Sequence, residues 1–412
     1  MDGRGAARWL AALALSGCGL VLDLDPRREE PLRDAGADAA LRDAGAPERD
    51  AGPDGGGDGG ADGGADGGAD GGADAGPNAF ACVEGETFRE ESFVASGLVE
   101  TASRGDEVAV VYHQAVDRAL IQILDPALRP VAQHPWDGTL DPSRLATTAR
   151  GFAMLERYDE RVGIVEVPSG ARAMTSGGVT AAGLSSDDPP FGAIGAILFG
   201  PSFALPGLIE LDVAGGGVSV NMIPALGAGP SVLDARLEHV VERAAYVTAW
   251  AEPSAVRVAR FSDTTRTLVG APVTITAALM REPDLTMAVA ADRVALAFRV
   301  VDGGAIAVLD PAGVAHLLVG GAEPRSSAAA VAAHRGAPGF GVARVVGTEL
   351  RFELRRWADP TLLGAALVVG APTEGDVLHV RAEPAPGHFL VARKPRTHGG
   401  PLTVTRVRCR FE

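Results

Sequence analysis

Lysine, cysteine and aromatic residues are scarce in this sequence. Its 412 residues contain 37 Lys and Arg against 53 Asp and Glu, a formal net charge of −16, and Lys394 is the only lysine. Nucleic-acid binding relies on clustered basic side chains that neutralise phosphates, so the acidic balance excludes DNA and RNA as the main partner. No run of about 20 apolar residues occurs, the length that a membrane-spanning helix requires. The length allows two or three domains, or one large all-β domain with a tail.

The N-terminus has the layout of an export signal. Two arginines precede a short apolar stretch at residues 9–15, and small residues follow, an order typical of secreted proteins. The segment Leu15-Ser16-Gly17-Cys18 resembles the lipobox of bacterial lipoproteins. This resemblance implies that residues 1–17 are a signal peptide and that Cys18 becomes the lipidated N-terminus. A plain secretory signal or an N-terminal buried helix is the alternative.

The residue after that cysteine bears on the location. Gly19 stands where the aspartate that favours inner-membrane retention in enterobacteria would lie. The resemblance therefore implies an outer-membrane anchor, with the protein facing the periplasm or the outside. Several acyl chains, at about 0.8 kcal/mol per buried methylene, hold a protein stably to a bilayer, so no further membrane segment is needed.

Residues 18–79 have the composition of a disordered, acidic linker. They contain few large apolar residues and include a repeated Gly-Gly-Ala-Asp unit between 59 and 74, so they cannot bury enough surface to offset the entropy of ordering. A chain of this kind has a root-mean-square reach of roughly 40 Å. A calcium-loaded β-roll is the alternative, but such rolls repeat about every nine residues, and the unit here has four.

Residues 80–412 are predicted to form a single all-β domain. Short apolar segments, separated by Gly, Pro and Asp, recur at a mean spacing of about 47 residues, which lies within the span of β-propeller blades. Each segment is followed by a turn and a second strand of alternating pattern. The seven apolar strands are predicted to begin near Val108, Phe152, Ala196, Ala244, Val294, Phe340 and His388.

A third element precedes most of these pairs. An acidic residue or glycine before proline introduces a short strand, and proline suits the first position of a strand, where no ladder donor is required. The whole resembles a seven-bladed β-propeller in which this element is the innermost strand. Six or eight blades, or a pair of β-sandwiches, are the alternatives. The five markers are Asp141-Pro142, Asp188-Pro189, Gly229-Pro230, Glu282-Pro283 and Glu323-Pro324.

The other two cysteines indicate how such a ring closes. If Cys18 carries lipid, Cys82 and Cys409 form an even pair in an oxidising compartment, one at each end of the folded domain. In a propeller the last blade is completed by a strand from the N-terminus, and residues 87–94 offer an unassigned strand. We therefore predict a Cys82–Cys409 disulfide across this seam. Two unrelated buried thiols are the alternative.

Candidate ligand-binding residues come from the loops that converge at one mouth of a propeller's central channel. Acidic side chains with interspersed aromatic rings could hold a cation or stack on a sugar ring, although the same residues are common turn formers. The loops before the innermost strands contribute Asp141, Asp188, Glu282 and Glu323, and the loops between the second and third strands contribute Tyr158, Asp159 and Trp250. No metal site is expected at the cysteines, because no CxxC motif or His pair at i, i+4 lies near them.

The sequence favours a binding or scaffolding module over an enzyme. It contains no Gly-x-Ser-x-Gly elbow of the kind that serine hydrolases use, and its glycine clusters do not precede helix N-termini that would bind phosphate. We expect no cofactor and an envelope protein or polysaccharide as ligand. The alternative is a carbohydrate-active propeller hydrolase or lyase, which requires a carboxylate with a raised pKa at the channel mouth. A third possibility is an envelope spacer without a ligand.

Overall fold

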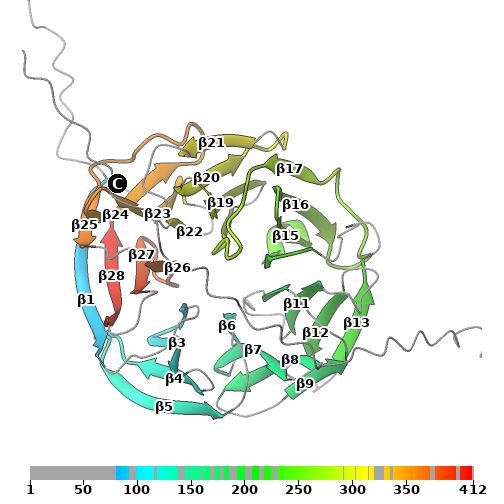
Figure 1. Cartoon of the computed structure of the whole chain (residues 1–412), viewed down its shortest axis with the longest axis horizontal. Helices are drawn as coiled ribbons and strands as arrows, with labels where there is room; N and C mark the ends of the chain where they lie inside the picture. Colours follow the sequence, from blue (N-terminus) through cyan, green and yellow to red (C-terminus); the bar gives the residue numbers. More distant parts are fainter. Residues whose placement is uncertain are drawn as a thin grey trace, which may run out of the picture. The chain divides into compact units, whose positions relative to one another are not determined.

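The computed structural model describes residues 80–410, with internal gaps of which the longest are 92–98, 138–143, 185–192, 200–206 and 320–328. The described residues form seven sheets of four strands, arranged as blades around one centre (Figure 1). Six sheets follow the order of the chain, and the seventh takes its outer strand from the beginning of the domain. The predicted seven-bladed, all-β propeller is therefore confirmed, and the two-sandwich alternative is excluded.

Each blade runs from an innermost strand at the ring centre to an outer strand at the rim. The innermost strands are β2 (Glu100–Arg104), β6 (Leu145–Thr147), β10 (Ala181–Leu184), β14 (Asp234–Val240), β18 (Thr286–Ala290), β22 (Ala329–Ala333) and β26 (Val377–Ala382). The second strands are β3 (Glu107–Ala115), β7 (Phe152–Tyr158), β11 (Ala193–Phe199), β15 (Ala245–Glu252), β19 (Arg293–Val300), β23 (Gly339–Val346) and β27 (His388–Lys394). The third strands are β4 (Arg118–Leu124), β8 (Arg161–Val167), β12 (Gly207–Asp212), β16 (Ala255–Ser262), β20 (Gly303–Leu309), β24 (Glu349–Arg356) and β28 (Leu402–Cys409). The outer strands are β5 (Pro130–Asp137), β9 (Arg172–Ser176), β13 (Val218–Met222), β17 (Val273–Thr276), β21 (Ala315–Val319), β25 (Leu367–Gly370) and β1 (Cys82–Glu90).

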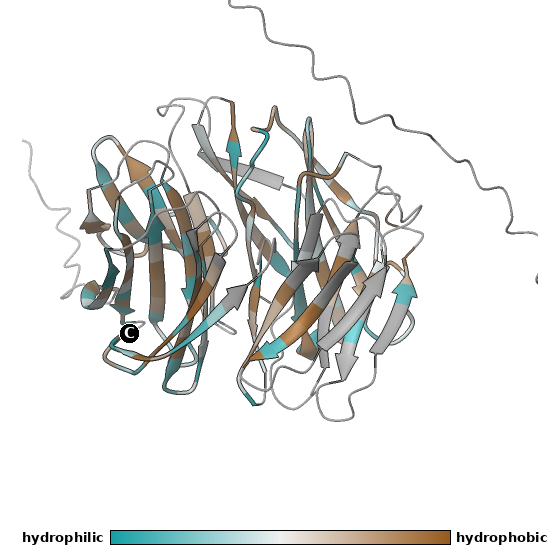
Figure 2. Cartoon of the chain, turned by 60° about the horizontal axis from the view of Figure 1, so that its bottom comes forward, coloured by the Kyte–Doolittle hydropathy of each residue, from teal (hydrophilic) through white to brown (hydrophobic). Residues whose placement is uncertain are grey.

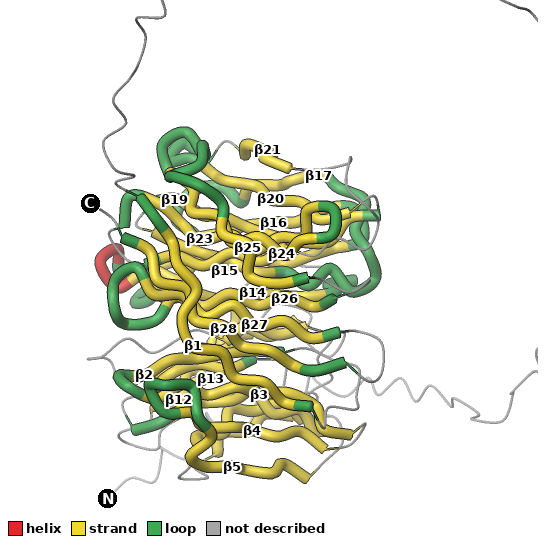
Figure 3. The backbone as a smooth tube through the Cα atoms, turned by 90° about the vertical axis from the view of Figure 1, so that its left-hand side faces the viewer, coloured by secondary structure: helices red, strands yellow, loops and turns green. Residues whose placement is uncertain are grey.

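The blades are numbered 1 to 7 in the order of their innermost strands. We call the end of the ring at which these strands begin the upper face and the other end the lower face. Figure 3 shows the strands lying across the domain, with loops gathered at its two ends. One turn of 3-10 helix, η2 (Val241–Arg243), joins β14 to β15 on the lower face. Within the described part of the chain, no helix has the length and apolarity that crossing a membrane would take.

All seven predicted pairs of second and third strands are present, and one predicted innermost strand is wrong. Asp188-Pro189 comes after β10 and before β11, so the innermost strand of blade 3 begins earlier than the proline marker indicates. The sequence of β10 is Ala-Ala-Gly-Leu, and a Cβ at Gly183 would lie 2.6 Å from the carbonyl carbon of Arg236. Because this strand packs closely on blade 4, it consists of small residues that give little β-strand signal.

Neighbouring blades pack face to face, so both sides of most blades are buried. Figure 2 shows broad apolar stretches along the described strands. In β15 the first seven of eight residues are buried, which matches the near-continuous apolar runs of sheets that are covered on both faces. Between blades 4 and 5, for example, Val247 of β15 packs in one cluster with Leu296 and Phe298 of β19.

β1 closes the ring by pairing antiparallel with β28, the third strand of blade 7. Cys82 and Cys409 lie opposite each other in this ladder and form a disulfide across a sequence separation of 327 residues, which confirms the predicted clasp. At the seam with blade 1, Phe88 and Tyr112 share an apolar cluster, and the Tyr112 hydroxyl donates a hydrogen bond to Glu90 at 3.3 Å. The seam is thus held covalently, by packing and by hydrogen bonding.

A buried arginine reinforces the same seam. Arg406 of β28 donates from Nε and Nη2 to the two carboxylate oxygens of Glu383, at 2.6 and 2.8 Å. Its Nη1 donates to Glu86 of β1 at 3.2 Å and to the carbonyl of Pro126 in blade 1. The paired geometry with one carboxylate is the strong, oriented form of the arginine ion pair, so Arg406 fixes β1 and blade 1 to the body of blade 7.

Candidate functional site

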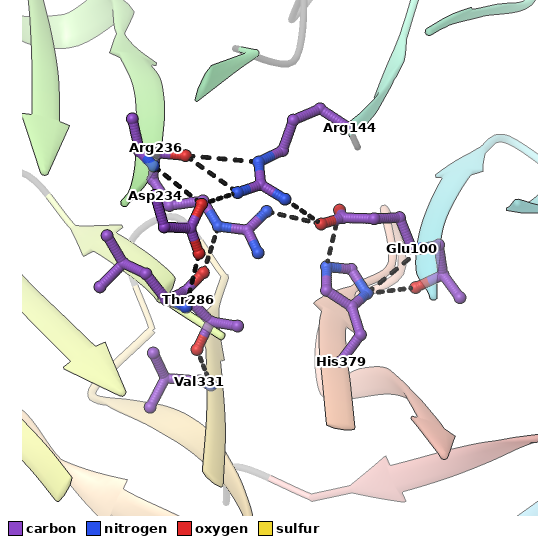
Figure 4. Close-up of polar contacts among 10 residues, drawn as sticks. Glu100, Arg144, Asp234, Arg236, Thr286, Val331 and His379 are labelled. Atoms are coloured by element: carbon purple, nitrogen blue, oxygen red, sulfur yellow. Dashed lines mark hydrogen bonds and ion pairs between the residues drawn. The ribbon is translucent and has the colours of Figure 1, made fainter. Parts of the chain in front are cut away.

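The upper ends of the innermost strands bring a group of charged side chains together at the ring centre. We call this group the central cluster. Figure 4 shows most of its members pointing toward one another from different blades. The cluster consists of Glu100 in blade 1, Arg144 before blade 2, Asp234 and Arg236 in blade 4, Asp284 and Arg299 in blade 5, and His379 in blade 7.

Glu100, the first residue of β2, is the acceptor that joins most of the cluster. Its Oε1 accepts from Arg144 Nη1 at 3.0 Å and from Arg236 Nη1 at 2.7 Å, and its Oε2 lies 3.2 Å from His379 Nε2. The side chain is 4% exposed. Burial alone would raise the pKa of this carboxyl, but the charges of Arg236 and Arg144 and the hydrogen bond from His379 hold it well below its usual range. Glu100 is therefore an ionised carboxylate.

Arg144 connects three blades. It lies directly before β6 in blade 2, and its guanidinium donates to Glu100 in blade 1 and to Asp234 in blade 4. Nε and Nη2 also donate to the carbonyl of Ala235, at 3.3 and 3.1 Å. The planar donor fork of arginine suits several acceptors at once. Blade 2 is thus fastened to blade 4 directly, past the innermost strand of blade 3.

Asp234 and Arg236 carry the network on to blade 5. Asp234 Oδ2 accepts from the backbone N–H of Leu285 at 2.9 Å, and Arg236 Nε donates to the carbonyl of the same residue. One step further round the ring, the Thr286 hydroxyl accepts from the backbone N–H of Val331 in blade 6 at 3.0 Å. The network therefore satisfies backbone groups that the inner edges of the blades would otherwise leave unpaired.

The hydrogen bonds of His379 fix its tautomer. The backbone N–H of Thr101 donates to His379 Nδ1 at 3.2 Å, and the Thr101 hydroxyl lies 3.0 Å from the same nitrogen. Because a backbone N–H can only donate, Nδ1 is an acceptor and the ring proton is on Nε2, facing Glu100. Burial lowers the pKa of His379. The charge of Glu100 opposes this shift, and the charge of Arg236 adds to it. His379 is thus a neutral donor that joins blades 7 and 1.

Asp284 differs from the other carboxylates of the cluster. It is 7% exposed and adopts a left-handed backbone conformation, with φ of 48°. Its Oδ2 accepts from Arg299 Nη1 at 3.3 Å. Burial raises its pKa to about 6, an effect that Arg299 opposes and the nearby charge of Asp234 increases. Asp284 thus has the raised pKa that a proton donor needs.

The central cluster is electrically balanced and largely self-satisfied. Three arginines face three carboxylates, and the histidine is neutral. The carboxylate oxygens of Glu100 and Asp234 accept hydrogen bonds from other groups of the protein. In the described residues, no three His, Cys, Asp or Glu side chains are grouped so as to hold a metal ion. Chemically, the cluster acts as a set of ties between blades at the ring centre.

Of the predicted ligand-binding residues, Trp250 and Glu282 have side chains that the structure describes. Trp250 is fully buried, its ring centre lies 5.7 Å from that of Phe199 in a tilted arrangement, and its Nε1 donates to Glu252 at 3.0 Å. It is a core residue and is not available at a channel mouth as predicted. Glu282 is exposed on the upper face, in the loop before β18.

The other predicted site residues cannot be compared in this way. Tyr158 ends β7, but its side chain is not among those described. The remaining four predicted acidic residues and the lipobox cysteine lie outside the described residues. They are Asp141, Asp159, Asp188, Glu323 and Cys18. In the chain order, Asp188 falls between β10 and β11, and not before the innermost strand of blade 3 as predicted.

The members of the central cluster have a signal in the sequence that the loop-based prediction missed. Glu100 and Asp234 are the first residues of innermost strands, Asp284 lies two residues before one, and Asp376 directly before another. Charged residues therefore recur at the start of the third element of the repeat. In blades 5 and 7 the acidic residue pairs with an arginine near the end of the second strand, Asp284 with Arg299 and Asp376 with Arg393.

Comparison with known proteins shows the architecture. No family model matches the chain, and no curated protein matches it in sequence. Among solved structures, hydrazine synthase of Kuenenia stuttgartiensis matches with a TM-score of 0.53 and 9% identity, over 76% of this chain and 95% of that one. The Dos1 propeller matches with a TM-score of 0.50 and 9% identity, over 79% and 95%. Virginiamycin B lyase from Staphylococcus aureus matches with a TM-score of 0.47 and 11% identity, over 80% and 99%. The likeness shows the fold alone.

Proposed function

We propose that this protein is a lipid-anchored lipoprotein of the cell envelope that presents its propeller as a non-catalytic binding or scaffolding module. The observation that carries this proposal is the central cluster. At the position where propeller enzymes could place reactive groups, the carboxylates of Glu100 and Asp234 are neutralised by Arg144 and Arg236. Side chains engaged in this way hold the blades together, so we assign binding to the outer surface of a rigid ring.

Two features support the envelope location. The Cys82–Cys409 disulfide suits an oxidising compartment, and the lipobox resemblance at Cys18 provides the anchor. The chain also enters the domain at the lower face, because Cys82 lies level with the end of β26 while Glu100 and His379 lie toward the upper face.

Mass spectrometry of the protein purified from membranes tests the anchor. We expect the mature chain to begin at an acylated Cys18, to partition into detergent, and to stay in the aqueous phase after Cys18→Ser. A mature chain that begins at another residue, or a wild type that partitions like the variant, would contradict the anchor.

Binding assays with isolated envelope polymers test the module. The probes are purified peptidoglycan and lipopolysaccharide, and the readouts are co-sedimentation of the protein and the size distribution of the polymer. Binding with an unchanged size distribution supports a module. Absence of binding to either polymer, or to envelope proteins captured by in-cell crosslinking, would favour the spacer.

A carbohydrate-active enzyme is the second candidate, and Asp284 is the observation that favours it. Its buried carboxyl has a pKa raised to about 6, in the same cluster as the Glu100 carboxyl, whose pKa is held well below its usual range. Carboxyl groups whose pKa values are pushed apart are typical of acid–base pairs in glycosidases. Depolymerisation of either probe that is lost in Asp284→Asn would establish this enzyme and overturn the non-catalytic module.

A further inference from the structure

The first residues of the domain are fastened to two blades before β1 begins its ladder. The Phe80 side chain packs against the apolar cluster between blades 6 and 7. Gly364, in the loop that follows β24, has φ of 82°, and a Cβ there would collide with the carbonyl oxygen of Phe80. The Ala81 carbonyl accepts from the backbone N–H of Arg410 at 3.0 Å. The entering chain is therefore seated on blade 6 and tied to the C-terminal end of β28.

β1 itself is a weakly buried strand. Along its nine residues only Phe88 is buried, and the others are exposed or half-buried. Its noncovalent contacts include the β-ladder, the packing of Phe88, and hydrogen bonds that join Glu86 to Arg406 and Arg408, Thr87 to Thr405, and Glu90 to Tyr112. Figure 1 shows β1 at the rim of the ring beside β28. Force applied to its first residue would break the pairs of the β1–β28 ladder one after another, which requires less force than breaking them all at once.

The disulfide lies at the rung where such a pull would begin. Cys82 is the first residue of β1, and its ladder partner is Cys409 at the end of β28. β28 is hydrogen-bonded on its other side to β27, so it is an interior strand of blade 7. While the bond is intact the first rung cannot separate, and tension that reaches Cys82 passes into β28 and the body of the blade.

We propose that residues 80–82 with Cys409 form a load-bearing attachment, through which tension on the preceding segment bypasses the β1 ladder. The inference rests on the proposed function in that an anchored protein with a bound partner experiences such tension. It goes further by assigning the clasp a mechanical role: it keeps the ring closed while the linker is pulled. Reduction of the disulfide would return the load to β1.

Optical-tweezers measurements on the full chain test this attachment. One handle is placed at the N-terminus of a Cys18→Ser variant, and the other on an azide-bearing residue that replaces the exposed Arg243 in η2 of blade 4. In reducing buffer we expect an early, low-force event that releases about 65 Å of chain, since residues 80–98 extend by about 3.4 Å each. In oxidising buffer this event should be absent, and the first event should occur at higher force.

Two variants sharpen the comparison. Cys82→Ser/Cys409→Ser should show the early event in both buffers. If that variant does not fold, reduction of the folded wild type still provides the comparison. Gly364→Ala unseats Phe80 and should lower the force of the early event in reducing buffer, while leaving the oxidised trace unchanged. An early 65 Å release from the oxidised protein, or equal first-event forces in the two buffers, would overturn the attachment.

Failure of the load-bearing attachment can be told apart from failure of the proposed lipid anchor. The handle replaces the lipid, so an unacylated Cys18 in cells would remove the anchor without changing the force traces. Conversely, a mature chain with an acylated Cys18 and an early release from the oxidised protein would retain the anchor and remove the load-bearing role of the disulfide.

Discussion

Neutralising Glu100 should destabilise the whole ring. In Glu100→Gln the side chain keeps its size, but Arg144 and Arg236 lose the anion that they share and His379 loses a carboxylate acceptor. The carboxylate is 4% exposed and the Arg144 side chain 3%, so solvent cannot replace it. Removing one partner of a buried ion pair costs about 3–5 kcal/mol. Because Arg144 and Arg236 keep Asp234 and backbone carbonyls as partners, we expect the lower end, about 3 kcal/mol.

The effect is measurable by urea and thermal unfolding. With an unfolding entropy of about 2.1 cal/mol/K per residue over about 330 residues, a loss of about 3 kcal/mol lowers Tm by roughly 4 °C. Fluorescence of the fully buried Trp250 and circular dichroism at strand wavelengths should report the same midpoint. Glu107→Gln is the matched control, because this glutamate is 52% exposed and pairs with Arg104 at 3.4 Å. It should change the free energy of unfolding by less than about 0.5 kcal/mol.

A double-mutant cycle measures the interaction energy between Glu100 and Arg144 apart from the other effects of each substitution. If Glu100 and Arg144 act as one unit, Glu100→Gln/Arg144→Met should cost less than the sum of the two single changes. Equal effects of Glu100→Gln and Glu107→Gln would refute the reasoning, since they would show that the central cluster contributes no more than a surface ion pair. Additive single changes would refute the coupling.

Three further outcomes are expected. Cys82→Ser/Cys409→Ser should lower the free energy of unfolding by at most about 6 kcal/mol, the loop-entropy value for a separation of 327 residues, and calorimetry of the oxidised and reduced wild type should show the same difference. The pKa of Asp284, raised to about 6 from 3.8, makes the folded state bind a proton that the unfolded chain releases between pH 4 and 6. The contribution of Asp284 to the free energy of unfolding should therefore rise as pH falls from 7 to 4.5, and urea unfolding of Asp284→Asn at several pH values should show a smaller rise. Tyr112→Phe should lose the hydrogen bond to Glu90 and about 1 kcal/mol in urea unfolding; an unchanged midpoint would show that this bond adds nothing to the seam.

The fold could be predicted from the sequence because the repeat is visible in its most apolar segments. The second and third strands of each blade are buried between neighbouring blades, so segments such as those beginning at Val108 and Phe340 stand out at a regular spacing. The innermost strand was harder to predict, because its small residues carry little signal. In blade 3 the proline marker at Asp188 therefore led to a wrong start for the strand, which is Ala181–Leu184.

The contacts of the central cluster were harder to predict than its members, because most of these contacts join residues from different blades. Glu100 and Arg236 are 136 residues apart in the chain, and no local pattern specifies that they meet. Trp250 was predicted to lie in the loop after the second strand of blade 4. β15 instead continues to Glu252 and is buried along its first seven residues, so Trp250 is part of the core. The cysteine pair was predictable because ring closure brings the two ends of the domain together.

The pairing of β1 with β28 also sets an order of events during synthesis. The first strand of the domain to be made finds its ladder partner only when the last strand is complete, 327 residues later at the disulfide. Contacts of such long sequence separation form slowly, so a nascent or truncated chain is an open arc of blades with an unpaired Cys82. A reactive thiol at this position would therefore mark every incomplete copy of the domain, and its disappearance would report that the ring has closed.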